Sequence, residues 1–129
     1  MCKTLLYSYL SALALFLPLA HADSHMQLSE DGLRFADGNA IHGAPLYKRY
    51  CRGCHGKDGR GGGHTFMPHV HKLTQKDYIN NIPDTFLFLV ISKGGEAVGK
   101  SSYMPAWETV LSPSDIKHVI AYIRSLPTY

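Results

Sequence analysis

The stretch Cys51-Arg52-Gly53-Cys54-His55 places two thiols two residues apart and follows them directly with a histidine. On one helical turn, the two thiols can each add across a vinyl group of a porphyrin, which leaves the imidazole of His55 beneath the iron as an axial ligand. This spacing is the pattern that attaches c-type haem. The sequence therefore predicts one covalently bound haem c, held through Cys51 and Cys54.

Two other uses of a Cys-x-x-Cys pair have to be weighed against haem attachment. A zinc site usually needs a second pair of ligands, which His64, His69 and His71 could supply. A dithiol redox pair needs a surrounding βαβ pattern, and no strand pattern of any length is present. Beyond residue 22 the chain contains no third cysteine. Haem attachment is therefore the favoured interpretation.

The first 22 residues have the pattern of a secretory signal peptide. Lys3 precedes an apolar run from Leu5 to Ala20, and Ala20-His21-Ala22 has the small residues of a cleavage site. An uncleaved membrane anchor is the alternative, but about 16 apolar-biased residues fall short of the roughly 20 that a spanning helix needs. We expect cleavage after Ala22, export to the periplasm and no membrane span in the mature chain.

The remaining chain is long enough for one domain and has an uneven distribution of charge. Residues 23–37 carry four acidic side chains and one basic side chain, whereas residues 38–129 carry 11 basic and 6 acidic side chains. We expect residues 23–39 to form a polar N-terminal extension and residues 40–129 to form a monomeric, basic domain.

Two helices and a loop are predicted in the first part of this domain. The helical pattern starts near Gly43, with Pro45 suited to the first turn, and this helix delivers the two cysteines. Residues 56–73 read as a loop with five glycines, without the strand or Gly-Lys-Ser/Thr ending of a phosphate-binding loop. Thr74 can cap a short helix that Pro83 stops. We expect no nucleic-acid partner.

Two further helices are predicted in the second part. An apolar helix runs from about Asp84 to Lys93 and closes at Gly94-Gly95; it is too short to span a membrane and suits a core position. Ser112-Pro113-Ser114-Asp115 opens the last helix with a relative of the capping box. Its apolar residues recur at intervals of three and four: Ile116, Val119, Ile120, Ile123 and Leu126. The fold class is predicted to be all-α.

Met104 is the candidate for the second axial ligand. A thioether is a soft donor that stabilises ferrous iron, and Pro105 stiffens the loop that holds it. The 49 residues from His55 to Met104 let the chain cross to the other haem face, whereas the 12 residues to Met67 make a tight path. One alternative is that Met104 only fills the core. Another is that the ligand is Met67 or one of three histidines: His64, His69 and His71.

The chain resembles a class I monohaem cytochrome c over about residues 40–126. The likeness rests on the attachment motif, on Met104-Pro105-Ala106-Trp107, and on three further elements: Gly43-x-x-x-Tyr47, Pro68 and Tyr122. The resemblance implies a small helical domain wrapped around the haem. It also implies that the N- and C-terminal helices cross at Gly43, with Tyr47 and Tyr122 interlocking.

The same resemblance assigns roles to two residues around the haem. It implies that the Pro68 carbonyl accepts a hydrogen bond from the ring of His55, and that Trp107 packs near the haem propionates. The chain departs from the family where the usual Gly-Pro of this loop is Met67-Pro68.

Iron with both axial positions filled by side chains suits one-electron transfer rather than catalysis. We therefore expect a periplasmic carrier that shuttles electrons between redox proteins and is not an enzyme. A basic rim around the motif would steer it to acidic patches on partners; its members are Lys48, Arg49, Arg52, Lys57, Arg60, Lys72 and Lys76. The alternatives are a haem-bearing subunit of a larger dehydrogenase or reductase, and a ligand-binding haem sensor or peroxidase.

Overall fold

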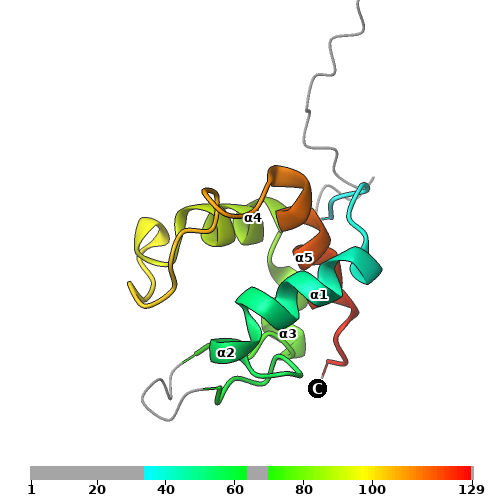
Figure 1. Cartoon of the computed structure of the whole chain (residues 1–129). Coiled ribbons are helices and arrows are strands. Elements are labelled where there is room, and N and C mark those ends of the chain that lie inside the picture. The colour runs from blue at the N-terminus through cyan, green and yellow to red at the C-terminus, as the bar shows by residue number, and fades with distance from the viewer. Residues whose placement is uncertain (1–33, 64–69, 129) are drawn as a thin grey trace, which may run out of the picture.

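The computed structural model describes residues 34–63 and 70–128, and within these ranges the chain is helical, without β-strands. The predicted all-α class is confirmed. In Figure 1, α1 and α5 lie across one another, with α4 above them and α2 and α3 below. The elements are α1 (Ala40–Tyr50), α2 (Arg52–His55), α3 (Lys76–Asn81), α4 (Asp84–Lys93), the 3₁₀-helix η1 (Glu96–Val98) and α5 (Pro113–Ser125).

The first helix begins three residues earlier than its sequence pattern predicted. The side chain of Asn39 accepts hydrogen bonds from the backbone N–H groups of Ile41 and His42, at 2.9 and 3.3 Å, and so caps the helix. Pro45 therefore lies inside α1 rather than in its first turn, which corrects the prediction.

The starts of the other helices agree more closely with prediction. α3 begins after Gln75, one residue beyond the predicted Thr74 cap. The predicted bounds of α4 are confirmed, and Gly94 follows its last residue. At α5 the capping box is present, because the Ser112 hydroxyl accepts from the Asp115 N–H while the Asp115 carboxylate accepts from the Ser112 N–H.

The close crossing of α1 and α5 forms the centre of the fold. A Cβ atom at Gly43 would lie 1.9 Å from the carbonyl oxygen of His118, so only glycine lets the two backbones approach this closely. The rings of Tyr47 and Tyr122 pack with centroids 5.1 Å apart. Tyr47 is buried, and its hydroxyl donates to the Gly56 carbonyl at 2.9 Å. The crossing implied by the family resemblance is confirmed.

We expect Gly43→Ala to lower the free energy of unfolding by about 1–3 kcal/mol, the usual cost of overpacking. The loss should appear although alanine forms helix better than glycine, because the obstructing atom belongs to rigid backbone. Guanidinium-induced unfolding of the haem-loaded protein measures this change in the free energy of unfolding. Ile41→Ala, in the same helix at a side chain 81% exposed, is the control and should change stability little. Equal stability of Gly43→Ala and the parent protein would contradict the tight crossing.

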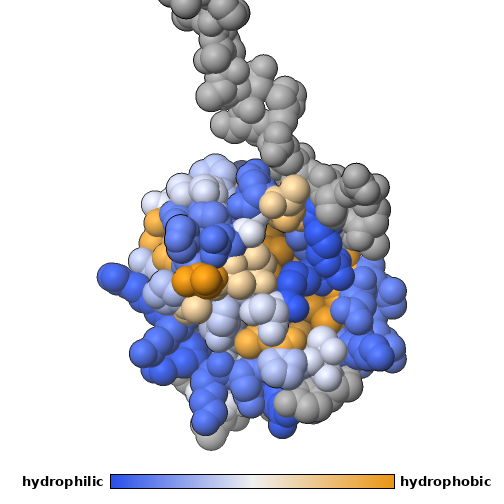
Figure 2. Space-filling model, turned by 90° about the vertical axis from the view of Figure 1, so that its right-hand side faces the viewer, coloured by the Kyte–Doolittle hydropathy of each residue, from blue (hydrophilic) through white to orange (hydrophobic). Residues whose placement is uncertain are grey.

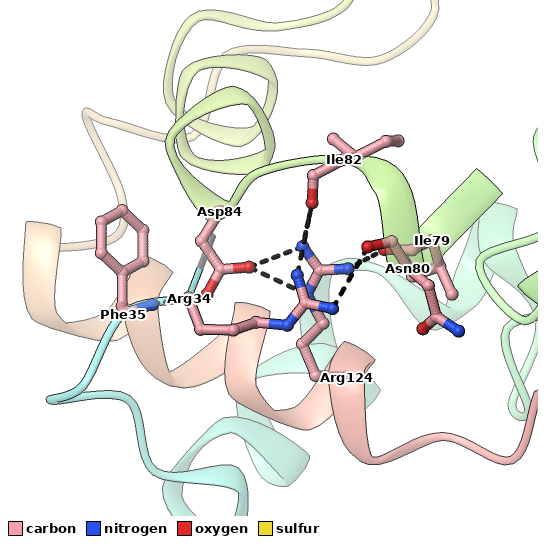
Figure 3. A network of polar contacts seen from close by, with 7 residues as sticks. All are labelled: Arg34, Phe35, Ile79, Asn80, Ile82, Asp84 and Arg124. Carbon is pink, nitrogen blue, oxygen red and sulfur yellow. Dashed lines mark hydrogen bonds and ion pairs between the residues drawn. The ribbon is translucent and has the colours of Figure 1, made fainter. Parts of the chain in front are cut away.

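A buried ion pair ties the residues before α1 to α4 and α5 (Figure 3). The Oδ2 atom of Asp84 accepts from the backbone N–H of Phe35 at 2.7 Å, and its Oδ1 atom accepts from Nε and Nη2 of Arg124 at 2.8 and 2.7 Å. Arg124 also donates to the carbonyls of Ile79 and Ile82. Part of the predicted N-terminal extension is thus packed against the helices, with Phe35 in the core.

The surface seen in Figure 2 is mostly hydrophilic, with apolar side chains gathered toward its middle. Among the residues that the structure describes, no helix has the length and apolar character needed to cross a membrane. The predicted signal peptide, residues 1–22, lies outside those residues.

Candidate haem site

A cavity of about 330 Å³ opens beside α4, lined by side chains from α2, α4 and the loop after η1. Its walls are mainly apolar, and α4 contributes Phe86, Leu87, Val90 and Ile91. The place of α4 in the wall of the cavity agrees with the prediction that this helix suits a core position. A concave site with mainly apolar walls is typical of cofactor-binding cavities.

The cysteines and the histidine of the motif lie on one turn at the edge of this cavity. The backbone N–H of His55 donates to the Cys51 carbonyl at 3.0 Å, which closes the turn, and all three side chains line the cavity. Residues Arg52–His55 of this turn form α2, a helix separate from α1, and Cys51 lies between the two. Cys51 and Cys54 are not joined to each other by a disulfide bond.

Burial sets the chemical state of the Cys51 thiol. Desolvation, with a smaller contribution from Cys54, raises the pKa of Cys51 to about 12. A raised pKa lowers the fraction of Cys51 that is thiolate at neutral pH.

The imidazole of His55 has the state that a metal ligand requires. Burial lowers its pKa, and the nearby backbone of His71 opposes this effect only in part, so the ring is neutral at pH 7. Its Nδ1 atom is buried and has no hydrogen-bond partner among the described residues. Pro68, whose carbonyl the family resemblance assigns to this nitrogen, lies outside them.

Met104 lines the same cavity as the motif, although it lies 49 residues further along the chain. The loop from η1 to α5 carries it, and its side chain is half-buried. Trp107 also lines the cavity, with its ring 5.3 Å from that of Tyr50. The structure thus brings the four sequence-predicted site residues together: Cys51, Cys54, His55 and Met104.

The alternative ligands are only partly visible. His71 lines the cavity and packs on Tyr78, with ring centroids 5.0 Å apart. Met67, His64 and His69 lie outside the described residues. Within residues 34–63 and 70–128, no group of three or more His, Cys, Asp or Glu side chains is arranged to hold a metal ion. Cys51, Cys54 and His71 therefore do not form a zinc site by themselves.

The residues present fit a haem. The donor set consists of two thiols, a neutral imidazole with a buried Nδ1 and a thioether, around a cavity with apolar walls. Sequence reasoning missed Gly95 and Lys100 as part of this site. The Gly94-Gly95 pair was interpreted only as the end of a helix, which gave no indication that Gly95 would lie against the methionine loop.

Residues 38–123 match the family model described as cytochrome C oxidase, cbb3-type, subunit III. Two curated relatives are cbb3-type cytochrome c oxidase subunits FixP, one from Bradyrhizobium diazoefficiens at 33% identity and one from Bradyrhizobium sp. at 31%, each over 88 residues. The alignments cover 68% of this chain and 28% of each relative, so the chain spans little more than a quarter of their length.

Two solved structures share the fold. KustC0563 c-type cytochrome has a TM-score of 0.57 at 21% identity, covering 67% of this chain and 98% of that one. Cytochrome CL from Methylophaga aminisulfidivorans has a TM-score of 0.53 at 27% identity, covering 68% of this chain and 53% of that one. The predicted small cytochrome c-like helical domain is confirmed by these similarities.

Proposed function

We propose that this chain, which belongs to the family of cytochrome c oxidase, cbb3-type, subunit III, carries single electrons between redox proteins. Membership of a cytochrome c family implies one covalently bound haem c. When bound, this group supplies one-electron exchange between ferric and ferrous iron. The observation that supports the proposal most directly is that the motif residues and Met104 line a single apolar cavity.

Each side chain has a distinct task in this proposal. Cys51 and Cys54 would hold the porphyrin through thioether bonds, and His55 and Met104 would ligate its iron. The apolar residues of α4 exclude water from the cavity. With His55 and Met104 as its ligands, the iron would offer no free position to oxygen or peroxide, which favours a carrier over an enzyme.

A second candidate is a haem-bearing module of a larger oxidase complex. The family match and the two FixP subunits favour it, because both descriptions refer to a cbb3-type cytochrome c oxidase. Purification of the tagged protein under mild conditions separates the two cases. Stable recovery with oxidase subunits supports the module, and recovery alone supports the free carrier.

The proposed place of work is the periplasm. The signal-peptide pattern of residues 1–22 supports export, and haem attachment to two thiols belongs to exported proteins. N-terminal sequencing of the exported red protein tests the proposal, with Asp23 as the expected first residue. An N-terminus that retains the apolar run would indicate an anchored protein instead.

An optical spectrum of the purified protein, oxidised and reduced, with and without carbon monoxide, tests the central proposal. We expect a c-type spectrum whose reduced form does not change on addition of carbon monoxide at neutral pH. Binding of carbon monoxide to the unmodified protein would favour a sensor or peroxidase. A colourless protein with two free thiols would contradict the haem itself.

A basic groove next to the attachment turn supports docking to acidic partners. It lies between α1, the end of α5 and the turn after α2, and three cations flank it: Lys48, Arg52 and Lys57. None of these three makes an ion pair with a residue that the structure describes, whereas Lys93, Lys117 and Arg124 are each paired. Three unpaired cations around one groove favour contact with carboxylates.

The triple variant Lys48→Gln, Arg52→Gln, Lys57→Gln is expected to slow oxidation of the reduced protein by ferricyanide, a trivalent anion, by about tenfold at low salt. The rate of the parent protein should fall with ionic strength, whereas the rate with a cationic cobalt complex should not. Stopped-flow absorbance measures both. Lys93→Gln, which removes a cation already paired with Glu108 at 2.7 Å, is the control. Equal rates for the triple variant and its parent would remove the groove from the docking proposal.

A further inference from the structure

We propose that Gly95 is a positioning residue for the Met104 thioether, and that the end of α4 determines where the sulfur lies. This inference rests on the proposed function, in which Met104 ligates the iron. Gly95 would position Met104 through a direct contact between the backbones of the two residues.

Gly95 contacts the methionine loop at two points. Its backbone N–H donates to the Met104 carbonyl at 2.9 Å, and its own carbonyl accepts from the Lys100 N–H at 2.8 Å. A Cβ atom at Gly95 would lie 2.2 Å from the Ser101 carbonyl oxygen and 3.3 Å from the Met104 Cβ. Any side chain at this position therefore pushes the loop away from α4.

The neighbouring Gly94 brings the rest of the loop onto the same helix end. Its φ of 83° is in the left-handed region, and a Cβ atom there would lie 2.9 Å from the Met104 carbonyl oxygen and 3.0 Å from the Ala106 backbone nitrogen. The loop thus lies directly on the turn that ends α4, the helix that forms a wall of the cavity.

The chain beyond Met104 is fastened to α4 as well. The backbone N–H of Trp107 donates to the Ile91 carbonyl at 3.0 Å, and that of Glu108 donates to the Ser92 carbonyl at 3.2 Å. Met104 therefore lies between two backbone attachments to one helix. The exposed ion pair between Lys93 and Glu108 adds little to this, because such pairs contribute about 0–1 kcal/mol.

The loop contains a matched control for Gly95. Gly95 has a φ of −68°, which alanine adopts without strain, so Gly95→Ala introduces only the contact. Gly99 has a φ of 68°, and a Cβ atom added there would have no neighbouring atom within 4 Å, so Gly99→Ala introduces backbone strain without a contact. The two variants separate displacement of the loop from simple destabilisation.

The test compares Gly95→Ala, Gly99→Ala and Met104→Ala, each haem-loaded, by reduction potential, carbon monoxide binding and far-ultraviolet circular dichroism. We expect Gly95→Ala to retain its helices, to bind carbon monoxide when reduced and to show most of the fall in potential seen in Met104→Ala. Gly99→Ala should exclude carbon monoxide and keep the parent potential. Lys100→Pro removes the shorter of the two hydrogen bonds to the Gly95 carbonyl, while the one from the Val98 N–H at 3.2 Å stays. This variant should also admit carbon monoxide, and it is the replacement test if Gly95→Ala fails to fold.

Failure of this inference differs from failure of the proposed function. If Met104→Ala admits carbon monoxide while folded Gly95→Ala and Lys100→Pro both exclude it at the parent potential, Met104 is a ligand but Gly95 does not position it. If Met104→Ala itself keeps the parent potential and excludes carbon monoxide, the proposed ligand is wrong and the inference fails with it. Equal effects of Gly95→Ala and Gly99→Ala would assign the change to lost stability.

Discussion

Met104→Ala is expected to keep its covalent haem, to have a lower reduction potential than the parent protein and to bind carbon monoxide when reduced. The thioether is a soft, weak donor that favours the ferrous state, so its loss stabilises ferric iron. The fall should be on the order of 0.1 V or more, within the span of about 0.8 V that axial ligation covers. A spectroelectrochemical titration measures the potential, and the Soret band of the reduced protein reports carbon monoxide.

Met67→Ala is the matched control, because Met67 also precedes a proline. It should leave both the potential and the response to carbon monoxide unchanged. The opposite pattern, in which only Met67→Ala opens the iron, would transfer the ligand role to Met67. If neither variant changes the protein, a histidine becomes the candidate, with His71 in the cavity wall.

Arg124→Met is expected to lower the free energy of unfolding by about 3–5 kcal/mol, the usual cost of removing one partner of a buried ion pair. The Asp84 side chain is only 4% exposed and would lose both hydrogen bonds from the guanidinium. The carbonyl of Ile79 would lose the hydrogen bond from Arg124 as well, and the carbonyl of Ile82 would keep only the longer one from Arg34 at 3.5 Å (Figure 3). Denaturant unfolding of the haem-loaded protein measures the change.

Glu108→Gln provides the comparison, since it breaks the exposed ion pair with Lys93 and should cost no more than about 1 kcal/mol. The double variant Arg124→Met, Asp84→Leu should recover part of the loss, because no unpaired charge then stays buried. If Arg124→Met destabilises the protein no more than Glu108→Gln, the pair between α4 and α5 does not hold the fold together.

Local patterns in the sequence were enough to predict much of the fold. The bounds of α4 follow from an apolar run between Pro83 and Gly94, and the start of α5 follows from the spacing of Ser112 and Asp115. Each of these helix ends is marked by residues that adjoin it in the sequence. The haem-attachment motif could likewise be recognised from neighbouring residues, since its cysteines and histidine lie on a single turn.

Contacts between distant segments could not be predicted in the same way. The approach of Gly95 to Met104 depends on where two loops meet, and a pair of glycines after a helix looks the same whether or not a loop covers it. The burial of Phe35 depends on Asp84, which lies 49 residues away. Nor does the helical period show that Asn39 rather than Gly43 sets the start of α1, because capping is a property of one side chain.

The crossing of α1 with α5 also bears on the order of events during synthesis and the proposed export of the chain. At this crossing the backbone N–H of Asn39 donates to the ring of His118, 79 residues further along the chain. This hydrogen bond cannot form until the chain has been synthesised as far as His118. Residues 51–55 emerge well before that. We therefore expect the thiols of Cys51 and Cys54 to be accessible to the attachment machinery while the chain is still unfolded. The packing of α5 on α1 would then complete the fold around the haem.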